Sequence, residues 1–340
     1  IGGQGVDESK SFRDLPDPKD RLGVYAKISR ARALAQGDDP AQAIPALKEI
    51  LAEAPEVVDA WFTLGNVHFK KHQWDEAARC YRETLERRPD HDWAMIGLAD
   101  TYVAKGKIDE AVAGYRQHLK SDPQNAQIQY RLGQVLLDAG RDGEAAEALR
   151  ATLAAEPKTA RAEVGLAVVA FRAKNFPAAH TALDRALSIS ANAKWAHYNR
   201  ALVFEAEGKM REALAAYRQE TGLYPESTRA LFNFGRALET TGDAPGALDA
   251  YRKALAADAD FTVARFFLAR LLLATGDLDG AAREATLALE KEPENPISPL
   301  GHFVLADVWN RQGRPQEAAR EARLGKELEA RIAQKKREGA

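Results

Sequence analysis

Residues 58–91 read VDAWFTLGNVHFKKHQWDEAARCYRETLERRPDH, and this stretch carries the pattern that decides the fold. Its first half places four side chains at the i, i+3, i+4, i+7 spacing of one helical face, namely Trp61, Leu64, Gly65 and His68. Its second half places three more on the face of another helix, namely Ala77, Tyr81 and Thr84. Pro89 then closes the second helix. The stretch therefore predicts a hairpin of two amphipathic helices.

The same pattern returns along the chain every 34 residues. Eight alanines form an unbroken series at this interval: Ala43, Ala77, Ala111, Ala145, Ala179, Ala213, Ala247 and Ala281. Prolines fall on the same grid at Pro55, Pro89, Pro123, Pro157, Pro225 and Pro293. A fixed period of this length is typical of a solenoid, in which each unit buries its apolar face by stacking on its neighbours. The 340 residues therefore predict one repeating array rather than two or three globular domains.

Small residues and prolines mark defined positions within each repeat. Six glycines fall at the turn inside a hairpin, where a left-handed residue ends the first helix: Gly106, Gly140, Gly208, Gly242, Gly276 and Gly313. Pro177 and Pro245 fall at the start of second helices, where a missing N–H costs nothing. One site in the first helix is always small, which predicts close helix approach there: Gly65, Ala99, Gly133, Ala167, Ala201, Gly235, Ala269 and Ala306.

The second repeat resembles the signature of the tetratricopeptide repeat (TPR) family at Trp61, Leu64, Gly65, Ala77, Tyr81 and Pro89. The resemblance covers about residues 24–332 and implies an all-α fold, a right-handed α-solenoid superhelix of about nine helix-turn-helix repeats. We expect these repeats at 24–57, 58–91, 92–125, 126–159, 160–193, 194–227, 228–261, 262–295 and 299–332. The register slips by three residues at Pro296-Ile297-Ser298.

The two ends of the chain depart from the repeat. Residues 1–23 are rich in Gly, Pro and Asp and predict a linker. Residues 315–340 predict an extended, polar C-terminal capping helix and tail. Inside the array, Ala191 and Ala259 stand where the closing proline is usual.

The resemblance implies that the first helices line the concave groove of the superhelix. One groove position is apolar in every repeat: Ile28, Phe62, Ile96, Tyr130, Val164, Tyr198, Phe232, Phe266 and Phe303. Exposed apolar strips with polar rims often mark binding sites, so we expect this row to contact a ligand. The alternative is that these side chains pack against the adjacent repeat.

Polar residues flank that row at neighbouring groove positions. The later repeats place five arginines there against Glu205 and Glu239: Arg161, Arg172, Arg229, Arg236 and Arg270. Asparagines, which donate and accept hydrogen bonds at once, occupy groove positions at Asn66, Asn199 and Asn233. We therefore predict an extended or acidic peptide ligand, held mainly by Arg229, Phe232, Asn233, Arg236 and Phe266. The alternative is that these polar residues are ordinary solvated surface.

The composition and motifs exclude several function classes. A net charge of −2 lacks the basic footprint of a nucleic-acid binder, and no apolar run has the roughly 20 residues of a membrane span. His68 and His72 have helical metal spacing without an evident third ligand, so we expect no metal and no cofactor. Cys80 is expected to be a packed thiol. No phosphate loop, nucleophile elbow or HExxH motif indicates catalysis.

The N-terminal segment carries a second resemblance. Ile1-Gly2-Gly3 and the later run from Leu15 to Arg21 resemble the junction between a bacterial sulfatase-type hydrolase and its TPR tail. The catalytic signature of that family is absent here, so any active site would lie upstream of Ile1, and the chain is expected to be a fragment or processed product. We predict an interaction scaffold that binds a peptide or protein partner. The alternative is a non-catalytic hydrolase tail, periplasmic or cytoplasmic, and self-association is a further prediction.

Overall fold

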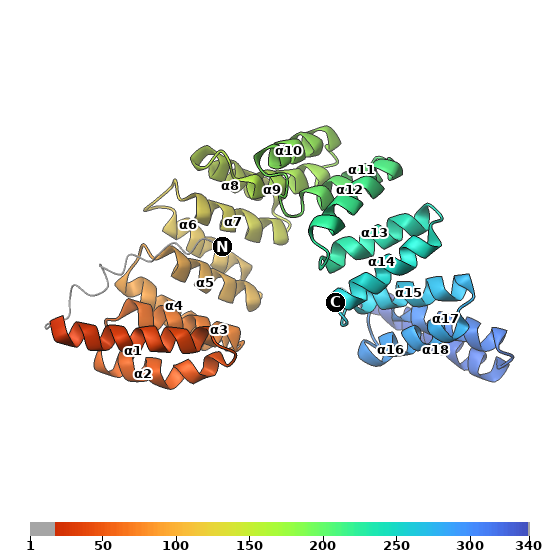
Figure 1. The fold of residues 1–340 in the computed structure, drawn as a ribbon, viewed down its shortest axis with the longest axis horizontal. Coiled ribbons are helices and arrows are strands. Elements are labelled where there is room, and N and C mark those ends of the chain that lie inside the picture. Colours follow the sequence, from red (N-terminus) through yellow and green to blue (C-terminus); the bar gives the residue numbers. More distant parts are fainter. Residues whose placement is uncertain (1–17, 339–340) are drawn as a thin grey trace. The chain divides into compact units, whose positions relative to one another are not determined.

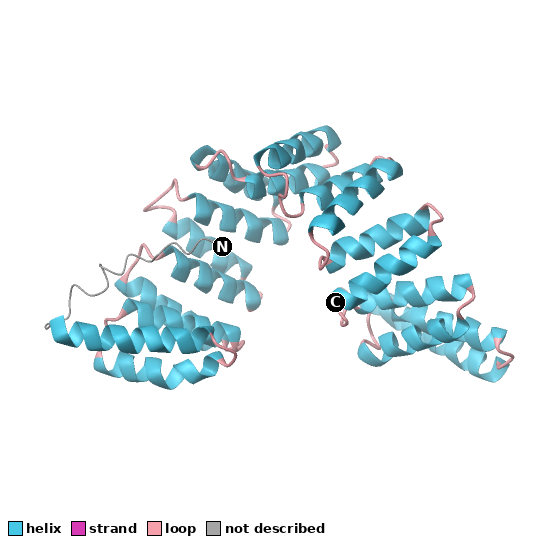
Figure 2. Ribbon diagram, in the orientation of Figure 1, coloured by secondary structure: helices cyan, strands magenta, loops and turns pink. Residues whose placement is uncertain are grey.

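The computed structural model describes residues 18–338, which form eighteen α-helices, one short 3-10 helix and no strand (Figure 1, Figure 2). The all-α class predicted from the sequence is therefore confirmed. The chain divides into two compact units. We call them unit 1, which ends at Val169, and unit 2, which begins at Ala170. Each unit is a series of antiparallel helical hairpins whose first and second helices alternate along the chain.

Unit 1 contains four complete hairpins and most of a fifth first helix. Its elements are α1 (Pro18–Gln36), η1 (Pro40–Gln42), α2 (Ala43–Glu53), α3 (Val58–Lys70), α4 (Trp74–Arg87), α5 (Asp92–Ala104), α6 (Ile108–His118), α7 (Ala126–Asp138), α8 (Asp142–Ala155) and α9 (Ala160–Arg172), which crosses the unit boundary.

Unit 2 continues with the remaining hairpins. Its elements are α10 (Phe176–Ile189), α11 (Ala196–Ala206), α12 (Met210–Leu223), α13 (Thr228–Thr240), α14 (Ala244–Ala257), α15 (Thr262–Thr275), α16 (Leu278–Lys291), α17 (Ser298–Arg311) and α18 (Pro315–Arg337).

The N-terminal linker is shorter than the sequence predicts. Helix α1 begins at Pro18, so the expectation that residues 18–23 are linker is wrong. The error arises because proline reads as a loop signal, although it is well tolerated in the first turn of a helix. The rest of the predicted linker, with most of the junction motif that begins at Ile1, lies outside the described residues.

Large side chains of second helices interlock with glycines of first helices. The Tyr81 ring of α4 lies so close to α3 and α5 that a Cβ added at Gly65 would be 2.9 Å from it, and one at Gly97 would be 2.5 Å away. Leu149 of α8 fills the same space between Gly133 and Gly165. These contacts link the hairpin of α3 and α4 to α5, and the hairpin of α7 and α8 to α9. Contacts between neighbours are how an array of units without individual cores becomes stable.

The turns inside the hairpins have the expected left-handed geometry. All six predicted glycines have positive φ, from 72° at Gly106 to 91° at Gly276. In two of the other hairpins, His72 and Lys174 stand at the equivalent turn position and adopt φ of 56° and 57°. These two residues adopt a left-handed backbone conformation that costs an L-residue roughly 1–2 kcal/mol.

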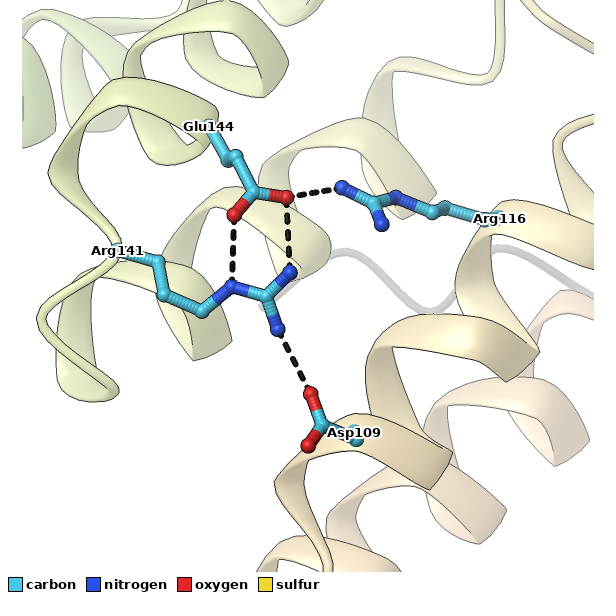
Figure 3. A network of polar contacts seen from close by, with 4 residues as sticks. All are labelled: Asp109, Arg116, Arg141 and Glu144. Carbon is cyan, nitrogen blue, oxygen red and sulfur yellow. Dashed lines mark hydrogen bonds and ion pairs between the residues drawn. The ribbon is translucent and has the colours of Figure 1, made fainter.

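Charged side chains also join two neighbouring hairpins of unit 1, close to the turn between α7 and α8. Arg141, which precedes α8, donates to both oxygens of Glu144, each at 2.8 Å, and to Asp109 of α6 at 2.9 Å. Arg116 of α6 donates to the same Glu144 carboxylate (Figure 3). Because both arginines hydrogen-bond it, the pKa of Glu144 is lowered to about 2. The network therefore connects the hairpin of α5 and α6 to the hairpin of α7 and α8.

Candidate peptide-binding face

The predicted apolar row is largely part of the core. Six of its members are buried, namely Ile28, Ile96, Val164, Tyr198, Phe232 and Phe266. Phe232 packs against the rings of Phe261 and Phe267 at centroid distances of 5.3 and 5.1 Å, and Phe266 is fully buried. The expectation of an exposed apolar strip is wrong, because these side chains fill the space between consecutive hairpins.

The three remaining members of the row are half-buried and also packed. Phe62 contacts the rings of Tyr81 and His91, and Phe303 lies against Gly325 of α18. Tyr130 is covered by the guanidinium of Arg161, whose central carbon is 4.2 Å from the ring centroid. Packing between neighbours, rather than exposure, accounts for the apolar character of this position in every repeat.

The polar residues of unit 2 form a connected surface on its first helices. Asn233 of α13 donates through Nδ2 to the Tyr198 hydroxyl of α11 at 2.9 Å. Its Oδ1 accepts from Nη1 of Arg236 at 3.3 Å. Asn199, next to Tyr198, instead donates to the backbone carbonyl of Trp195 at 2.8 Å. We call the surface that Tyr198, Asn233, Arg229 and Arg236 make the α11–α13 face.

The glutamates beside this face already have partners. Glu205 of α11 accepts a hydrogen bond from the Tyr217 hydroxyl, which reaches it from α12. Glu239 of α13 accepts from the Tyr251 hydroxyl at 3.0 Å and pairs with Arg270 of α15 at 2.7 Å. Each carboxylate is therefore oriented by groups of the protein itself, and Arg270 is committed to an ion pair.

Two arginines of the same face remain without a carboxylate. Arg229 and Arg236 are exposed, and no side chain among residues 23–338 forms an ion pair with either of them. Burial, the largest influence, raises the pKa of Tyr198, while Arg229, Asn233 and Arg236 each act to lower it. The α11–α13 face therefore presents two guanidinium groups that form no ion pair with a described carboxylate, beside polar hydrogen-bonding groups.

Helix α11, which carries Tyr198 of this face, has an unusual N-terminus. Trp195, the N-cap of α11, has φ of 69°, and α11 begins only at Ala196. The buried carboxylate of Glu220 accepts hydrogen bonds from the backbone N–H groups of Trp195 at 3.1 Å and Tyr198 at 3.2 Å. Desolvation raises the pKa of Glu220, and these backbone donors oppose that rise. A side chain from α12 thus caps the N-terminus of α11.

Sequence reasoning missed Trp195 as a member of this site. Its half-buried indole meets the Tyr198 ring edge-on, with centroids 5.4 Å apart. Trp195 occupies the same repeat position as Arg161 and Arg229, at steps of 34 residues, so the register already pointed to it. Nothing in the sequence indicates the Glu220 cap, since it depends on a carboxylate 25 residues away.

The other predicted site residues are placed differently. In unit 1, Asn66 accepts from the Tyr81 hydroxyl at 2.8 Å, and Arg161 covers Tyr130. Arg172 is exposed at the end of α9. None of these three is among the residues that define the α11–α13 face.

Two residues that the sequence offers as reactive groups, His68 and Cys80, are buried, whereas His72 is exposed. His68 is buried and its Nδ1 shares a hydrogen bond with Gln73 at 2.7 Å. Within the described part of the chain, no cluster of three or more His, Cys, Asp or Glu side chains could hold a metal ion. Cys80 is buried, and desolvation raises the pKa of its thiol to about 11. Among residues 18–338, no helix has the length and apolarity needed to cross a bilayer.

Comparison with known families identifies the repeat. Tetratricopeptide repeat models match residues 28–92, 62–126, 96–151, 130–194 and 198–260, then 240–300, then 299–323. The chain therefore belongs to the tetratricopeptide repeat family, and its fold is the predicted α-solenoid of TPR hairpins. No curated protein matches its sequence.

Solved structures share this fold at low sequence identity. A tetratricopeptide repeat protein from Parabacteroides merdae has a TM-score of 0.62 at 17% identity, covering 74% of this chain and 99% of its own. The Cut9-Hcn1 hetero-tetramer of the APC/C has a TM-score of 0.55 at 13% identity, covering 92% of this chain and 62% of its own. PilF of Pseudomonas aeruginosa has a TM-score of 0.50 at 21% identity, covering 60% of this chain and 93% of its own. At these identities the likeness concerns the fold alone.

Proposed function

We propose that this protein is an interaction scaffold that binds an extended, acidic peptide on the α11–α13 face of unit 2. Helical-repeat arrays of this kind present extended surfaces for partner proteins. The observation that carries the proposal is the pair of exposed arginines, Arg229 and Arg236, which lack carboxylate partners on a surface where the neighbouring glutamates are already bonded.

The chemistry of these groups suits a peptide carboxylate. A guanidinium presents a planar fork of donors that matches a carboxylate in bidentate geometry. The amide of Asn233 keeps one N–H that does not take part in its bond to Tyr198, and this N–H can donate to a ligand carbonyl. Binding through exposed charges is screened by salt, so the affinity of such a ligand falls as ionic strength rises.

The predicted aromatic anchors have to be revised in this proposal. Phe232 and Phe266 are buried, so they position α13 and α15 and leave ligand contact to the polar residues. No contact among residues 18–338 favours the two other predictions, a hydrolase tail and self-association.

Selection of peptides displayed on phage tests the proposal. The wild-type chain is expected to enrich acidic peptides, and the double variant Arg229→Ala, Arg236→Ala is expected to lose that enrichment. The matched control is Arg218→Ala, Arg252→Ala, which removes the same charge from exposed positions on α12 and α14. Equal loss in both double variants would mean that net charge, and not this face, attracts the peptides. Equal enrichment in all three proteins would remove the α11–α13 face from consideration.

A further inference from the structure

The two arginines of the α11–α13 face that have no carboxylate partner, Arg229 and Arg236, lie at a fixed spacing on one helix. Arg229, Asn233 and Arg236 stand at i, i+4 and i+7 of α13, so they share one face of it. A helix rises 1.5 Å per residue, which separates the two arginine positions by roughly 10.5 Å along the axis. Each guanidinium can form its own bidentate pair with a carboxylate, so full use of both cations needs two acidic groups.

The backbone conformation of a ligand decides which acidic residues match this spacing. In a β-strand, residues on one side alternate, and their separations are about 6.7 or 13.4 Å. In a polyproline II helix, every third residue returns to the same side after about 9.3 Å. The polyproline II period therefore comes closest, among extended conformations, to the axial spacing of the two arginine positions.

Asn233 gives a reason to favour a polyproline II ligand over a helical one. A helical ligand could also place acids about 10.5 Å apart, at i and i+7. The backbone carbonyls of a helix are bonded internally, whereas those of a polyproline II segment are unpaired. Asn233 lies between the arginines, and its remaining amide N–H needs such a free carbonyl. This amide favours the extended ligand.

The aromatic pair at one end of the face adds an independent argument. The Trp195 indole meets the Tyr198 ring edge-on, and the Tyr198 hydroxyl is bonded to Asn233. Trp195 is held in a left-handed conformation by Glu220, and the Lys194 ammonium lies 5.8 Å from the centroid of its ring. Backbone strain that the surrounding structure holds in place is found most often at functional sites. Aromatic surfaces are the usual docking partners of proline-rich, polyproline II segments.

We propose that the α11–α13 face recognises a polyproline II segment that carries two acidic residues three positions apart, with prolines between them. One carboxylate pairs with Arg229 and the other with Arg236, Asn233 binds an intervening backbone carbonyl, and a proline contacts Trp195. This inference rests on the proposed peptide-binding function and specifies its ligand class.

Capped synthetic peptides of identical composition test the spacing by fluorescence anisotropy at low salt. The sequence Glu-Pro-Pro-Glu, set in a neutral flanking segment, is expected to bind about two- to fivefold more tightly than Pro-Glu-Glu-Pro in the same segment, since each exposed ion pair contributes little on its own. Arg229→Ala and Arg236→Ala are each expected to abolish this preference. Arg218→Ala, which removes an exposed arginine of α12, is the matched control and should preserve it.

The outcomes separate the inference from the function on which it rests. Equal affinity for the two proline peptides, or tighter binding of an alanine-based helical peptide with glutamates at i and i+7, would overturn the polyproline II ligand and leave peptide binding standing. No detectable binding of any of these acidic peptides would overturn both proposals. The variants replace exposed side chains, and far-UV circular dichroism of each is the check that its helices are retained.

Discussion

The Glu220 carboxylate gives the most specific prediction about the local structure behind the α11–α13 face. Its side chain is fully buried and accepts from the N–H groups of Trp195 and Tyr198 at 3.1 and 3.2 Å. Glu220→Ala leaves both donors without this acceptor. Hydrogen bonds to a charged group contribute about 1.5–3 kcal/mol each, and these two are long, which gives about 3 kcal/mol in gross terms.

Part of that loss is offset. Burial raises the pKa of Glu220, so the carboxylate itself carries a desolvation cost that the alanine variant no longer bears. We expect a net local destabilisation of about 2 kcal/mol, or roughly thirtyfold in the opening equilibrium. In a repeat array this loss is felt mainly by the hairpins next to the change.

Native-state hydrogen exchange measures this effect at the residues concerned. The amides of Trp195 and Tyr198 are expected to exchange about thirtyfold faster in Glu220→Ala than in the wild type. The matched control is Gln219→Ala, an exposed neighbour on α12, which should leave both rates unchanged. Unchanged exchange at Trp195 and Tyr198 in the Glu220 variant would refute the capping role.

Four further predictions follow from single contacts. Lys174→Gly should raise the free energy of unfolding by up to about 1 kcal/mol in urea titration, because it relieves a φ of 57°; a loss would contradict the strain. Gly235→Ala should cost about 1–3 kcal/mol, since its Cβ would lie 2.6 Å from the Tyr251 ring, whereas Gly222→Ala, with nothing within 4 Å, should be neutral or stabilising. The folded-state pKa of Glu144 is about 2, below that of an unfolded glutamate. Its contribution to the free energy of unfolding is therefore present above about pH 4.5 and disappears as the pH falls toward 2. The urea midpoints of the wild type and Glu144→Gln should converge over that range. Alkylation of Cys80 at neutral pH should be slow in the folded chain and fast in urea, and rapid labelling of the native protein would contradict its burial.

Much of the fold was predictable because the repeat makes each signal occur several times. The 34-residue grid placed the turn glycines, and their positive φ follows from a chain reversal that only glycine makes without strain. The small residues of the first helices were likewise explained by Tyr81 and Leu149, which fill the space that the glycines leave. Periodicity fixes such positions because every hairpin has to satisfy the same contacts with its neighbours.

The exposure of the candidate site was not predictable by the same reasoning. A position that is apolar in every repeat is equally compatible with a ligand surface and with packing between hairpins, and burial of Phe232 and Phe266 shows the second. The left-handed residue and the side-chain cap at the N-terminus of α11 could not be predicted from the repeat pattern either. Ala191 in place of the closing proline marked the repeat as irregular, yet the left-handed Trp195 and its Glu220 acceptor arise from tertiary contacts.

The position of a bound peptide tests the central claim most directly. A Glu-Pro-Pro-Glu peptide with a photoreactive group at its centre can be cross-linked to the chain, and the attachment site can be read by mass spectrometry. The account predicts attachment to α11 and α13, at residues neighbouring Asn233 and Tyr198, and loss of the adduct in Arg229→Ala, Arg236→Ala. Attachment to the exposed surfaces of α12 and α14 would contradict it.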